Sequence, residues 1–402
     1  MVTYPKDWEN TTLGKLGEVK MCKRIFQSQT RPSGQIPFYK IGTFGDIPDA
    51  YISRELFENY KNQYSFPQKG DVMISAAGTI GRTVVYDGKD AYFQDSNIVW
   101  LEVNPDEVDR KFLMYFYQSY PWVNLEGTTI SRLYNGIIRG TTIHLPPLPE
   151  QKAIAAALDA FDTYIANLSE LIEKKKGIRD GALEDLVSGN TRLKGFDREW
   201  ITVPFDQYFT ILKNNTYARD QLTERGTVAN IHYGDVLVKF GDVISDNDDI
   251  PFLSPGVEYS EKWLLQEKDV IIADTAEDET VGKAVQVGKI SYPLVGGLHT
   301  IVCRPNYDTA TGFLGYYVNS KVYHDQLLPH ITGIKVSSIS KKAIKTTEVT
   351  VPKDVKEQEA IAEVLESMDS EISALEKERE KMIQIREGAM ADLLTGKVRL
   401  SV

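Results

Sequence analysis

The amino-acid sequence contains one long segment twice. Residues 150–193 return without a gap as residues 357–400, and roughly 20 of about 44 aligned positions are identical. The first copy begins Glu-Gln-Lys-Ala-Ile-Ala, the second begins Glu-Gln-Glu-Ala-Ile-Ala, and both end in Arg-Leu. Chance does not produce such a match. We therefore expect the chain to be built from two equivalent halves.

Both copies have the apolar pattern of a long helix. Apolar residues recur at alternating steps of four and three from Ile154 to Ile172, and again from Ile361 to Leu375. This spacing is the a/d seam of a coiled coil. We predict an antiparallel pair, because each helix must exit beside the opposite domain if the two halves are to close into a ring. The residues expected to face each other along the seam are Leu158, Ile165, Leu168, Leu365, Ile372 and Leu375.

Prolines near the helix starts and glycines near the helix ends support these boundaries. They are Pro149, Pro352, Gly189 and Gly396. At about 1.5 Å per residue, some 38 residues make a rod of about 57 Å, which suits a spacer. The alternative is a pair of independent amphipathic core helices, which the duplicated seam disfavours. Glycines inside a helix cost about 1 kcal/mol each relative to alanine, so Gly177, Gly181 and Gly388 are expected where another backbone comes close.

The segments that precede the two helices also correspond, although weakly. Asp7-Trp8 matches Glu199-Trp200, and residues 70–75 match residues 268–273. Short β-rich runs between Gly/Asp turns predict a mixed α+β globule in each half. The predicted fold is thus α+β, with two globular domains separated by two long antiparallel coiled-coil helices and related by a pseudo-twofold internal repeat. The predicted boundaries are 1–145 for the first domain, 146–193 for the first helix, 194–352 for the second domain and 353–402 for the second helix.

Composition narrows the class of protein without deciding its partner. The net charge of -11 argues against simple binding to nucleic acid, because duplex binding uses basic side chains. The charge is uneven, however, since residues 1–45 carry seven basic and three acidic side chains while residues 357–380 are strongly acidic. Cys22 and Cys303 are far apart, the N-terminus has no apolar region, and no run of about 18 apolar residues occurs. These features lead us to expect a cytoplasmic protein without a membrane partner.

The repeat and the segments around it resemble the DNA-specificity subunit of type I restriction-modification systems. The resemblance covers essentially the whole chain. It is carried by the Leu-Pro-rich entry at residues 145–155 and its second copy, by the helix ends at residues 189–193 and 396–400, and by the Gly-Asp-hydrophobic run at residues 70–81. The second half departs from the pattern at residues 352–356, which replace the proline-rich entry, and at residues 274–283, which replace the glycine loop.

This resemblance implies a target-recognition domain in each half, and each of these domains would read one half of a bipartite target on double-stranded DNA. The helices would set the gap between the half-sites, and two modification (methylase) subunits would dock on them. Restriction subunits would join the complex. The resemblance implies no cofactor in this chain, because S-adenosylmethionine, ATP and Mg would be bound by the partner subunits.

No catalytic site is predicted in the chain itself. The sequence lacks the Asn/Asp-Pro-Pro-aromatic tetrapeptide of methyltransferases, the Gly-x4-Gly-Lys-Ser/Thr phosphate loop and the Gly-x-Ser-x-Gly nucleophile elbow. The histidines lack a metal-ligand spacing such as His-Glu-x-x-His, so we expect no metal site and take them as surface or core residues. They are His144, His232, His299, His324 and His330.

Three polar groups in the first domain are candidates for DNA contact. The first combines the Arg, Gln and Ser/Thr types that read base edges, and the second, a glycine loop, can bring backbone N–H groups to phosphates. Each has a structural alternative, a tight turn for the glycine loop and a solvated loop for the others. The candidates are Lys23, Arg24, Gln27, Ser28, Gln29, Thr30 and Arg31; Ser75, Thr79 and Arg82; and Thr128, Thr129, Ser131, Arg132 and Asn135. In the second domain they are Lys283, Lys335, Ser337, Ser338, Lys341 and Lys342.

Three other functions compete with this interpretation. A specificity subunit of a related system, in which the partner fuses methylase and nuclease, would have the same architecture. A coiled-coil scaffold that binds no nucleic acid would show no DNA shift with its partner present, and a stand-alone enzyme would turn over without partners.

Overall fold

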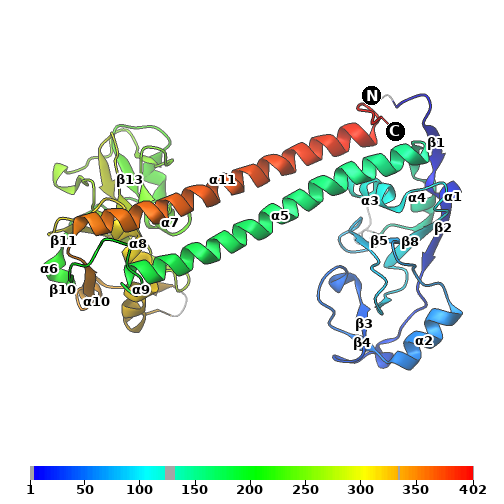
Figure 1. Ribbon diagram of the computed structural model, residues 1–402, viewed down its shortest axis with the longest axis horizontal. Coiled ribbons are helices and arrows are strands. Elements are labelled where there is room, and N and C mark those ends of the chain that lie inside the picture. The colour runs from blue at the N-terminus through cyan, green and yellow to red at the C-terminus, as the bar shows by residue number, and fades with distance from the viewer. Residues whose placement is uncertain (1–3, 123–131, 334–335, 402) are drawn as a thin grey trace. The chain divides into compact units, whose positions relative to one another are not determined.

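The computed structural model of the 402-residue chain describes residues 4–122, 132–333 and 336–401. The chain divides into two compact units. Unit 1 comprises Met1–Ser169 and Lys377–Val402, and unit 2 comprises Glu170–Glu376. Each unit therefore contains one globular domain together with parts of both long helices (Figure 1).

The globular domain of unit 1 is built on an antiparallel sheet in the order β2-β8-β5-β6. Val72 and Ile74 of β5 are buried in one core with Phe112 of α3, whereas Met73 is buried in a second core with Trp100. Successive side chains of a strand point to opposite faces, so a run of buried apolar residues indicates a sheet that is covered on both sides. A smaller sheet, β4-β3-β7, lies on the side of the second core.

The elements of this domain are β1 (Glu9–Thr12), α1 (Leu13–Leu16), β2 (Gly17–Met21), β3 (Ile36–Tyr39), β4 (Tyr51–Ile52), α2 (Arg54–Gln63), β5 (Val72–Ser75), β6 (Thr83–Val85), β7 (Tyr92–Phe93), β8 (Ile98–Val103), α3 (Arg110–Ser119), α4 (Asn135–Gly140) and β9 (Thr142–Leu145).

The globular domain of unit 2 repeats this plan. Its main sheet has the order β11-β20-β16-β18-β14, and its smaller sheet has the order β12-β15-β13-β19. Val270 and Ile272 of β16 share a core with Phe313 of α8, whereas Ile271 belongs to the core of the smaller sheet. The weak correspondence between the two domains in sequence is therefore a correspondence of fold.

The elements of this domain are β10 (Trp200–Pro204), α6 (Phe205–Tyr208), β11 (Phe209–Leu212), β12 (Leu222–Thr223), β13 (Ala229–Ile231), α7 (Tyr233–Val238), β14 (Val243–Ile244), β15 (Phe252–Leu253), β16 (Val270–Ala273), β17 (Thr275–Ala276), β18 (Ala284–Val287), β19 (Leu294–Gly296), β20 (Thr300–Pro305), α8 (Phe313–Asn319), α9 (Lys321–Leu327), β21 (Ser337–Ser338), α10 (Lys341–Ile344) and β22 (Glu348–Pro352).

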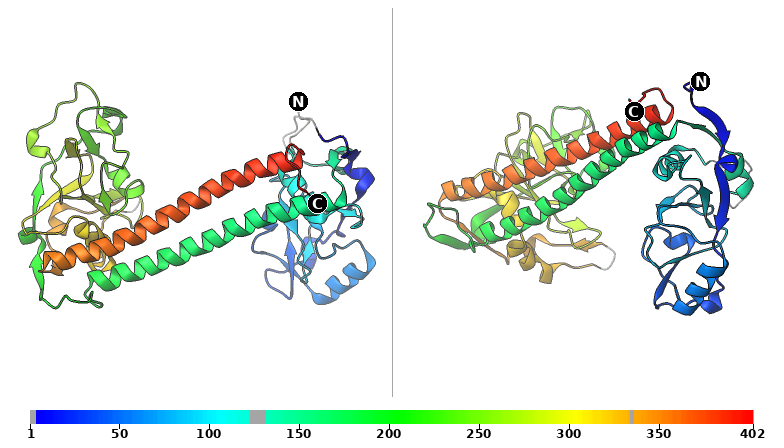
Figure 2. Two further views of the ribbon diagram at one scale, coloured as in Figure 1. Left: turned by 45° about the horizontal axis from the view of Figure 1, so that its top comes forward. Right: turned by 45° about the vertical axis from the view of Figure 1, so that its right-hand side comes forward.

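The two repeated segments form α5 (Leu148–Val187) and α11 (Val355–Leu394), each 40 residues long. In unit 1 the first part of α5 lies beside the last part of α11, where Arg386 donates to Asp162 at 2.9 Å. In unit 2 the last part of α5 lies beside the first part of α11, where Arg179 donates to Asp369 at 2.9 Å. The two helices are thus antiparallel, as predicted (Figures 1 and 2).

The predicted seam residues are buried to different degrees. Leu158 and Leu365 are fully buried, Leu168 and Ile372 are 6% and 8% exposed, and Ile165 and Leu375 are half-buried. Leu158 belongs to the core of unit 1 with Leu393 and Leu394 of α11. Leu365 belongs to the core of unit 2 with Leu183, Leu186 and Val187 of α5. Both therefore pack among residues of their own globular domain as well as the other helix, and a seam shared by all six residues stays a prediction.

The expectation for the glycines inside the helices was wrong. A Cβ atom added at Gly177, Gly181 or Gly388 would meet nothing within 4 Å, and all three residues are exposed. Helical periodicity shows which face of a helix is apolar, but it does not show what lies outside the polar face. The glycines at the helix ends behave as predicted, because Gly189 and Gly396 have positive φ angles of 75° and 68°.

Candidate nucleic-acid interface

In unit 1 the three candidate loops meet at the turn before β8. Arg24 of the first loop pairs with Asp95 of this turn at 2.8 Å. Arg132 of the third loop donates to the carbonyl oxygen of Ser96 at 3.2 Å, and it forms a β-bridge with Ala77 of the glycine loop. Loops that are far apart in the sequence therefore form one cluster at the end of the main sheet, which we name loop cluster 1 (residues 23–31, 75–82, 94–97 and 132–135).

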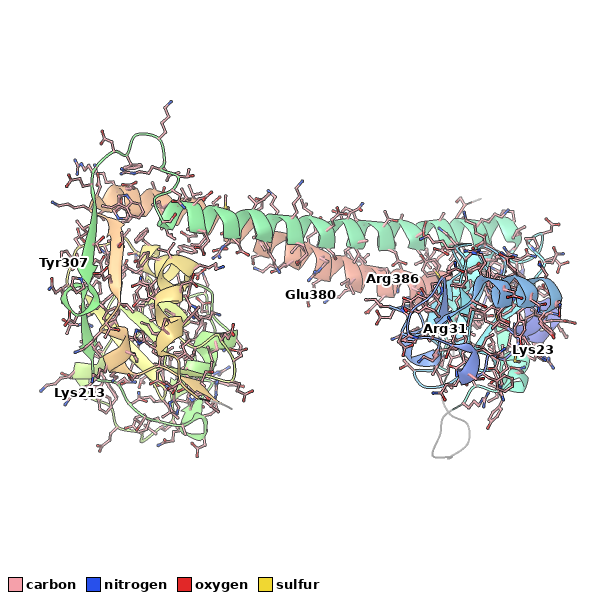
Figure 3. The ribbon with its side chains drawn as sticks, turned by 90° about the horizontal axis from the view of Figure 1, so that it is seen from below. Lys23, Arg31, Lys213, Tyr307, Glu380 and Arg386 are labelled. Carbon is pink, nitrogen blue, oxygen red and sulfur yellow. The ribbon has the colours of Figure 1, made fainter. Side chains whose placement is uncertain are left out.

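The first loop presents exposed polar side chains from a folded backbone. Lys23 and Arg31 are exposed (Figure 3), and so are Gln27 and Ser28. Gln29 is half-buried, and its side chain accepts a hydrogen bond from the amide of Phe26 at 2.9 Å, which fixes the short helical turn over residues 27–29. A cavity of about 580 Å³ opens beside this loop, lined among others by Gln27, Thr30, Arg31, Lys40 and Gln94. Lys40 and Gln94 stand in segments without a motif, so no sequence pattern indicates them.

The glycine loop combines a structural and an exposed part. Ser75 is only 2% exposed, and its hydroxyl donates to the carbonyl oxygen of Thr79 at 2.5 Å and accepts from the amide of Arg82 at 2.9 Å. Ser75 therefore holds the turn closed and does not face solvent. Thr79 and Arg82 are exposed, and the Arg82 guanidinium donates to the carbonyl oxygen of Phe44 at 2.7 Å.

The third loop is described only in part. Arg132 and Asn135 are half-buried, and Asn135 is the first residue of α4. Thr128, Thr129 and Ser131 lie outside the described residues, and so does Lys335 in the second domain.

Unit 2 has an equivalent cluster at the same end of its main sheet. The amide of Asp274 donates to the carbonyl oxygen of His299 at 3.1 Å, as the amide of Ala76 does to Asn97 at 2.7 Å in unit 1. Strand β17, at the start of the loop that replaces the glycine loop, pairs with β21, which contains the candidates Ser337 and Ser338. We name this group loop cluster 2 (residues 213–215, 274–282, 297–299 and 337–342).

The lysine candidates of unit 2 differ in their surroundings. Lys341 and Lys342 are exposed at the start of α10. Lys283 is half-buried, and its ammonium group donates to the carbonyl oxygens of Leu237 and Phe240 at 2.9 and 3.2 Å. Burial lowers the pKa of the Lys283 ammonium group. These contacts give Lys283 a role in holding α7, which the sequence did not reveal.

Charged residues of the repeat bind the start of each helix to the end of the other. In unit 1, Arg399 donates to Glu150 at 2.5 and 2.8 Å and to Asp7 at 2.8 and 3.0 Å. In unit 2, Arg192 donates to Glu357 at 2.8 and 2.6 Å. Both glutamates are 1% exposed. Paired bonds between a guanidinium and a buried carboxylate are strong and directional, so they fix where each domain meets the helices of its unit.

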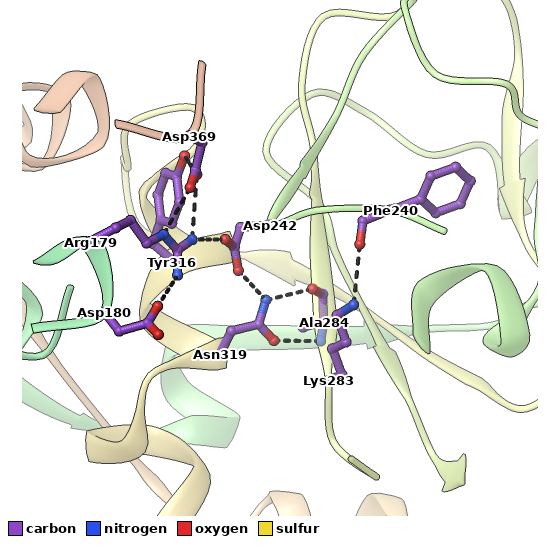
Figure 4. A network of polar contacts seen from close by, with 9 residues as sticks. All are labelled: Arg179, Asp180, Phe240, Asp242, Lys283, Ala284, Tyr316, Asn319 and Asp369. Atoms are coloured by element: carbon purple, nitrogen blue, oxygen red, sulfur yellow. Dashed lines mark hydrogen bonds and ion pairs between the residues drawn. The ribbon is translucent and has the colours of Figure 1, made fainter. Parts of the chain in front are cut away.

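A polar network also joins the helices of unit 2 to the globular domain (Figure 4). Arg179 of α5 donates to Asp369 of α11 and to Asp242, and Tyr316 of α8 donates to Asp369 at 2.8 Å. Asn319 donates to Asp242 at 2.7 Å. Burial raises the pKa of the Asp242 carboxyl group, and the positive charge of Arg179 opposes that rise.

Unit 1 repeats the Arg-Asp-Tyr part of this network. Arg386 donates to Asp162, and Tyr115 donates to the same carboxylate at 2.8 Å. Where unit 2 uses Asp242, the Arg386 guanidinium of unit 1 donates to Gln118 at 3.1 Å. Both domains therefore attach to the helices through one Arg-Asp-Tyr arrangement.

Comparison with known proteins shows the family to which this chain belongs. The family model described as "Type I restriction modification DNA specificity domain" matches residues 5–175 and 199–384. The chain belongs to this family. The two matches correspond to the two halves, so the chain is a specificity subunit with two specificity domains of the type I restriction-modification kind.

Named relatives agree with this assignment. A putative type I restriction enzyme specificity subunit from Haemophilus influenzae is 55% identical over 158 residues, which cover 39% of this chain and 41% of the relative. The putative MjaX specificity subunit from Methanocaldococcus jannaschii is 24% identical over 419 residues, covering 98% of this chain and 95% of the relative. The specificity subunit thus shares high identity with one relative over about two fifths of that relative's length.

Solved structures share the fold. A chain from a structural study of complex assembly and conformational transition of the type I restriction-modification system is 16% identical, with a TM-score of 0.59. The alignment covers 99% of the specificity subunit and 100% of that chain.

Two further findings concern membranes and metals. None of the described helices is both long and apolar enough to cross a bilayer. Within residues 4–122, 132–333 and 336–401, no group of three or more His, Cys, Asp or Glu side chains is arranged to hold a metal ion. The absence of a metal and of a cofactor in this subunit stays a prediction.

Proposed function

We propose that this specificity subunit is non-catalytic and that each of its domains reads one half of a bipartite target on double-stranded DNA. The observation that carries the proposal is the presence of two equivalent loop clusters, one at the end of the main sheet in each unit. Two equivalent loop clusters in one chain suit a target with two half-sites. The side chains of loop cluster 1 include the Arg, Gln and Ser/Thr types that read base edges in the major groove.

The proposal also reconciles the acidic composition with DNA binding. The net charge of the chain is -11, but Lys23, Arg24, Arg31 and Arg82 are all exposed in loop cluster 1. Contact with phosphates depends on the local basic side chains, because the interaction of exposed charges is screened within about 10 Å at moderate salt. A local basic cluster is therefore compatible with a chain whose net charge is negative.

We assign the chemistry of the complex to its partners. Two modification subunits would dock on the helices and bind S-adenosylmethionine, and restriction subunits would bind ATP and Mg. Support comes from one repeated surface feature, named here the Ile-Gly patch. Ile178 is 51% exposed with the open Gly181 one turn later, and the repeat places Ile385, 42% exposed, before the open Gly388. Two equivalent patches suit two copies of one partner.

A domain exchange tests the reading function. Residues 1–145 are replaced by those of a relative, and the complex with its modification subunits is expressed for methylation mapping of the host genome. We expect one half of the methylated sequence to change and the other half to stay. A change in both halves would contradict separate readers. A chain that shifts no DNA with its partners present would be a scaffold.

Substitution of the Ile-Gly patch tests the docking function. Ile178→Asp and Ile385→Asp each place a charge in one patch, and we expect each to remove one modification subunit from the complex, measured as its mass in solution. Val398→Asp is the matched control, because Val398 is 46% exposed beyond the end of α11. Unchanged assembly in both patch variants would show that the partners dock elsewhere.

A further inference from the structure

His299 stands at the centre of loop cluster 2. Its carbonyl oxygen binds the amide of Asp274, its ring lies beside the side chains of Asp274 and Thr275, and β20 begins at the next residue. In the equivalent turn of unit 1, Asn97 has the same backbone contact to Ala76. No sequence motif surrounds His299, so the sequence alone predicts an ordinary surface or core histidine.

The backbone and the ring of His299 are both held in place. Its φ angle is +55°, a left-handed conformation that non-glycine residues adopt at a cost of roughly 1 kcal/mol or more. The ring nitrogen Nδ1 lies 3.2 Å from Asp274 Oδ1 and 3.3 Å from Thr275 Oγ1. The ring of Tyr233 meets the imidazole edge to face, with 5.3 Å between centroids. The side chain nevertheless remains 47% exposed, so one edge of a fixed ring faces solvent.

The hydrogen-bond partners decide which ring nitrogen carries the proton. Thr275 has a single hydroxyl proton, and it donates this proton to Asp274 Oδ1 at 2.8 Å. Neither Thr275 nor the Asp274 carboxylate then offers a proton to His299, so Nδ1–H of the imidazole must be the donor. In the neutral imidazole, a proton on Nδ1 leaves the lone pair on the other nitrogen, Nε2. Among the described residues, none forms a hydrogen bond with Nε2.

From this geometry we infer that His299 determines specificity in the second half-site, where Nε2 accepts a hydrogen bond from an exocyclic amino group of a base. The inference rests on the proposed reading function. In the major groove only adenine N6 and cytosine N4 present such amino donors, whereas guanine and thymine present carbonyl acceptors at the corresponding edge. Asp274 and Thr275 are positioning residues, because they hold the tautomer and do not contact the base. His299 thus selects adenine or cytosine at one position.

Two substitutions of His299 separate the side chain from the backbone. His299→Gly keeps the left-handed backbone and removes the ring. His299→Asn also tolerates that backbone, and it leaves a shorter polar side chain. Each variant is expressed as a full chain with its modification and restriction subunits, and the methylated sequences are mapped across the host genome. The half-site read by unit 1 serves as the internal control for folding and assembly.

We expect one position of the second half-site to lose its preference for adenine or cytosine by roughly fivefold or more in His299→Gly, as for the loss of one hydrogen bond. The first half-site should not change. Asp274→Asn gives a sharper test, because its amide can donate to Nδ1 and so move the proton to Nε2. The preferred base should then change from adenine or cytosine to guanine or thymine at that position.

The outcomes distinguish this inference from the proposed function. If the wild-type complex methylates no bipartite sequence, the proposed function fails. If the wild-type sequence is bipartite and His299→Gly leaves every position unchanged, only the role of His299 is overturned. An equal loss of methylation at all sites, without a change of preference, would also overturn it, because that result indicates a structural residue.

Discussion

Ion pairs between a buried glutamate and an arginine hold each domain of the specificity subunit to the helices of its unit. Glu150 and Glu357 belong to the repeated Glu-Gln entry, and Arg192 and Arg399 belong to the repeated Arg-Leu end. The sequence marked these residues as repeated, but it did not show that the end of one copy binds the start of the other. That contact depends on the antiparallel path of the helices, which brings together residues more than a hundred positions apart. A buried carboxylate that loses its cation is costly.

Arg192→Ala should therefore destabilise unit 2. The expected loss is about 2–3 kcal/mol, less than for a fully buried ion pair, because the Arg192 side chain is 28% exposed while that of Glu357 is 1% exposed. Arg198→Ala is the matched control, since Arg198 is 72% exposed in its pair with Asp354 and should contribute about 0–1 kcal/mol. Urea unfolding of both variants measures the difference, and equal losses would show that burial of Glu357 is unimportant.

We expect His232 to make the stability of unit 2 depend on pH. Its Nδ1 accepts a hydrogen bond from the amide of Gly234 at the start of α7, which requires the neutral imidazole. Burial lowers the pKa of His232 from its ordinary value of 6.5, and Arg219 lowers it further. The unfolded chain therefore binds more protons between the two pKa values. The stability from this group is complete above about pH 6.5 and is lost as the pH falls through the folded-state pKa.

The test compares the thermal midpoint at about pH 7.5 and about pH 5.5 for the wild type and for His232→Asn. Asparagine caps a helix without titrating in this range, so the variant should lose less stability on acidification than the wild type. Other histidines, such as His144, are present in both proteins and cancel in the comparison. An identical pH dependence would show that His232 does not contribute to it.

At the scale of elements, hydrophobic periodicity predicted the helices and strands whose apolar face can be recognised within a single segment. The steps of four and three identified both long helices, and the β-rich run at residues 72–75 became β5. The expectation that another backbone lies close to Gly177, Gly181 and Gly388 was wrong, because a sequence pattern carries no information about what lies outside the polar face of a helix. The roles of Ser75 and Lys283 were missed for a related reason. The Ser75 hydroxyl binds a carbonyl oxygen within its own loop and the Lys283 ammonium group binds carbonyl oxygens of a distant segment, and only the folded chain places those atoms beside them.

The helices should tolerate truncation of an exposed leucine and not of a buried one. Leu168 of α5 is 6% exposed, whereas Leu171, one turn away, is 39% exposed. Leu168→Ala should cost about 2–5 kcal/mol through lost burial and the cavity that remains. Leu171→Ala should change the free energy of unfolding by less than about 0.5 kcal/mol. Urea denaturation followed by circular dichroism provides the measurement, and equal costs would place Leu168 outside the packed face.

At the scale of the whole molecule, the duplication allowed the order of the domains to be predicted from the sequence. The order of the strands within each domain could not be predicted in this way. The two halves align without a gap only along the helices, and their recognition domains keep few common residues. Even so, both main sheets follow one plan, with β8 and β20 as the second strands. Because the loops diverge in length and charge, sequence comparison does not detect the similarity of the two main sheets. The strand pairing shows this similarity, because backbone hydrogen bonds constrain the register of the strands.

The last prediction concerns the distance between the half-sites. Four residues are inserted after Ser169 in α5 and four after Glu376 in α11, where each helix passes from one unit to the other. The pairs Arg386 with Asp162 and Arg179 with Asp369 each lie within one unit, so the insertions leave both pairs intact. Each insertion adds about 6 Å and slightly more than one helical turn, so the apolar faces nearly keep their direction.

If the helices set the gap, methylation mapping should show both half-sites unchanged and the gap longer by about two base pairs, because base pairs are spaced by about 3.4 Å. Inserting four residues in the segment at residues 194–198 is the control, since this segment lies outside both helices, and the gap should then stay as in the wild type. A helix insertion that changes base identity and not spacing would mean that the helices take part in reading and do not act as a spacer.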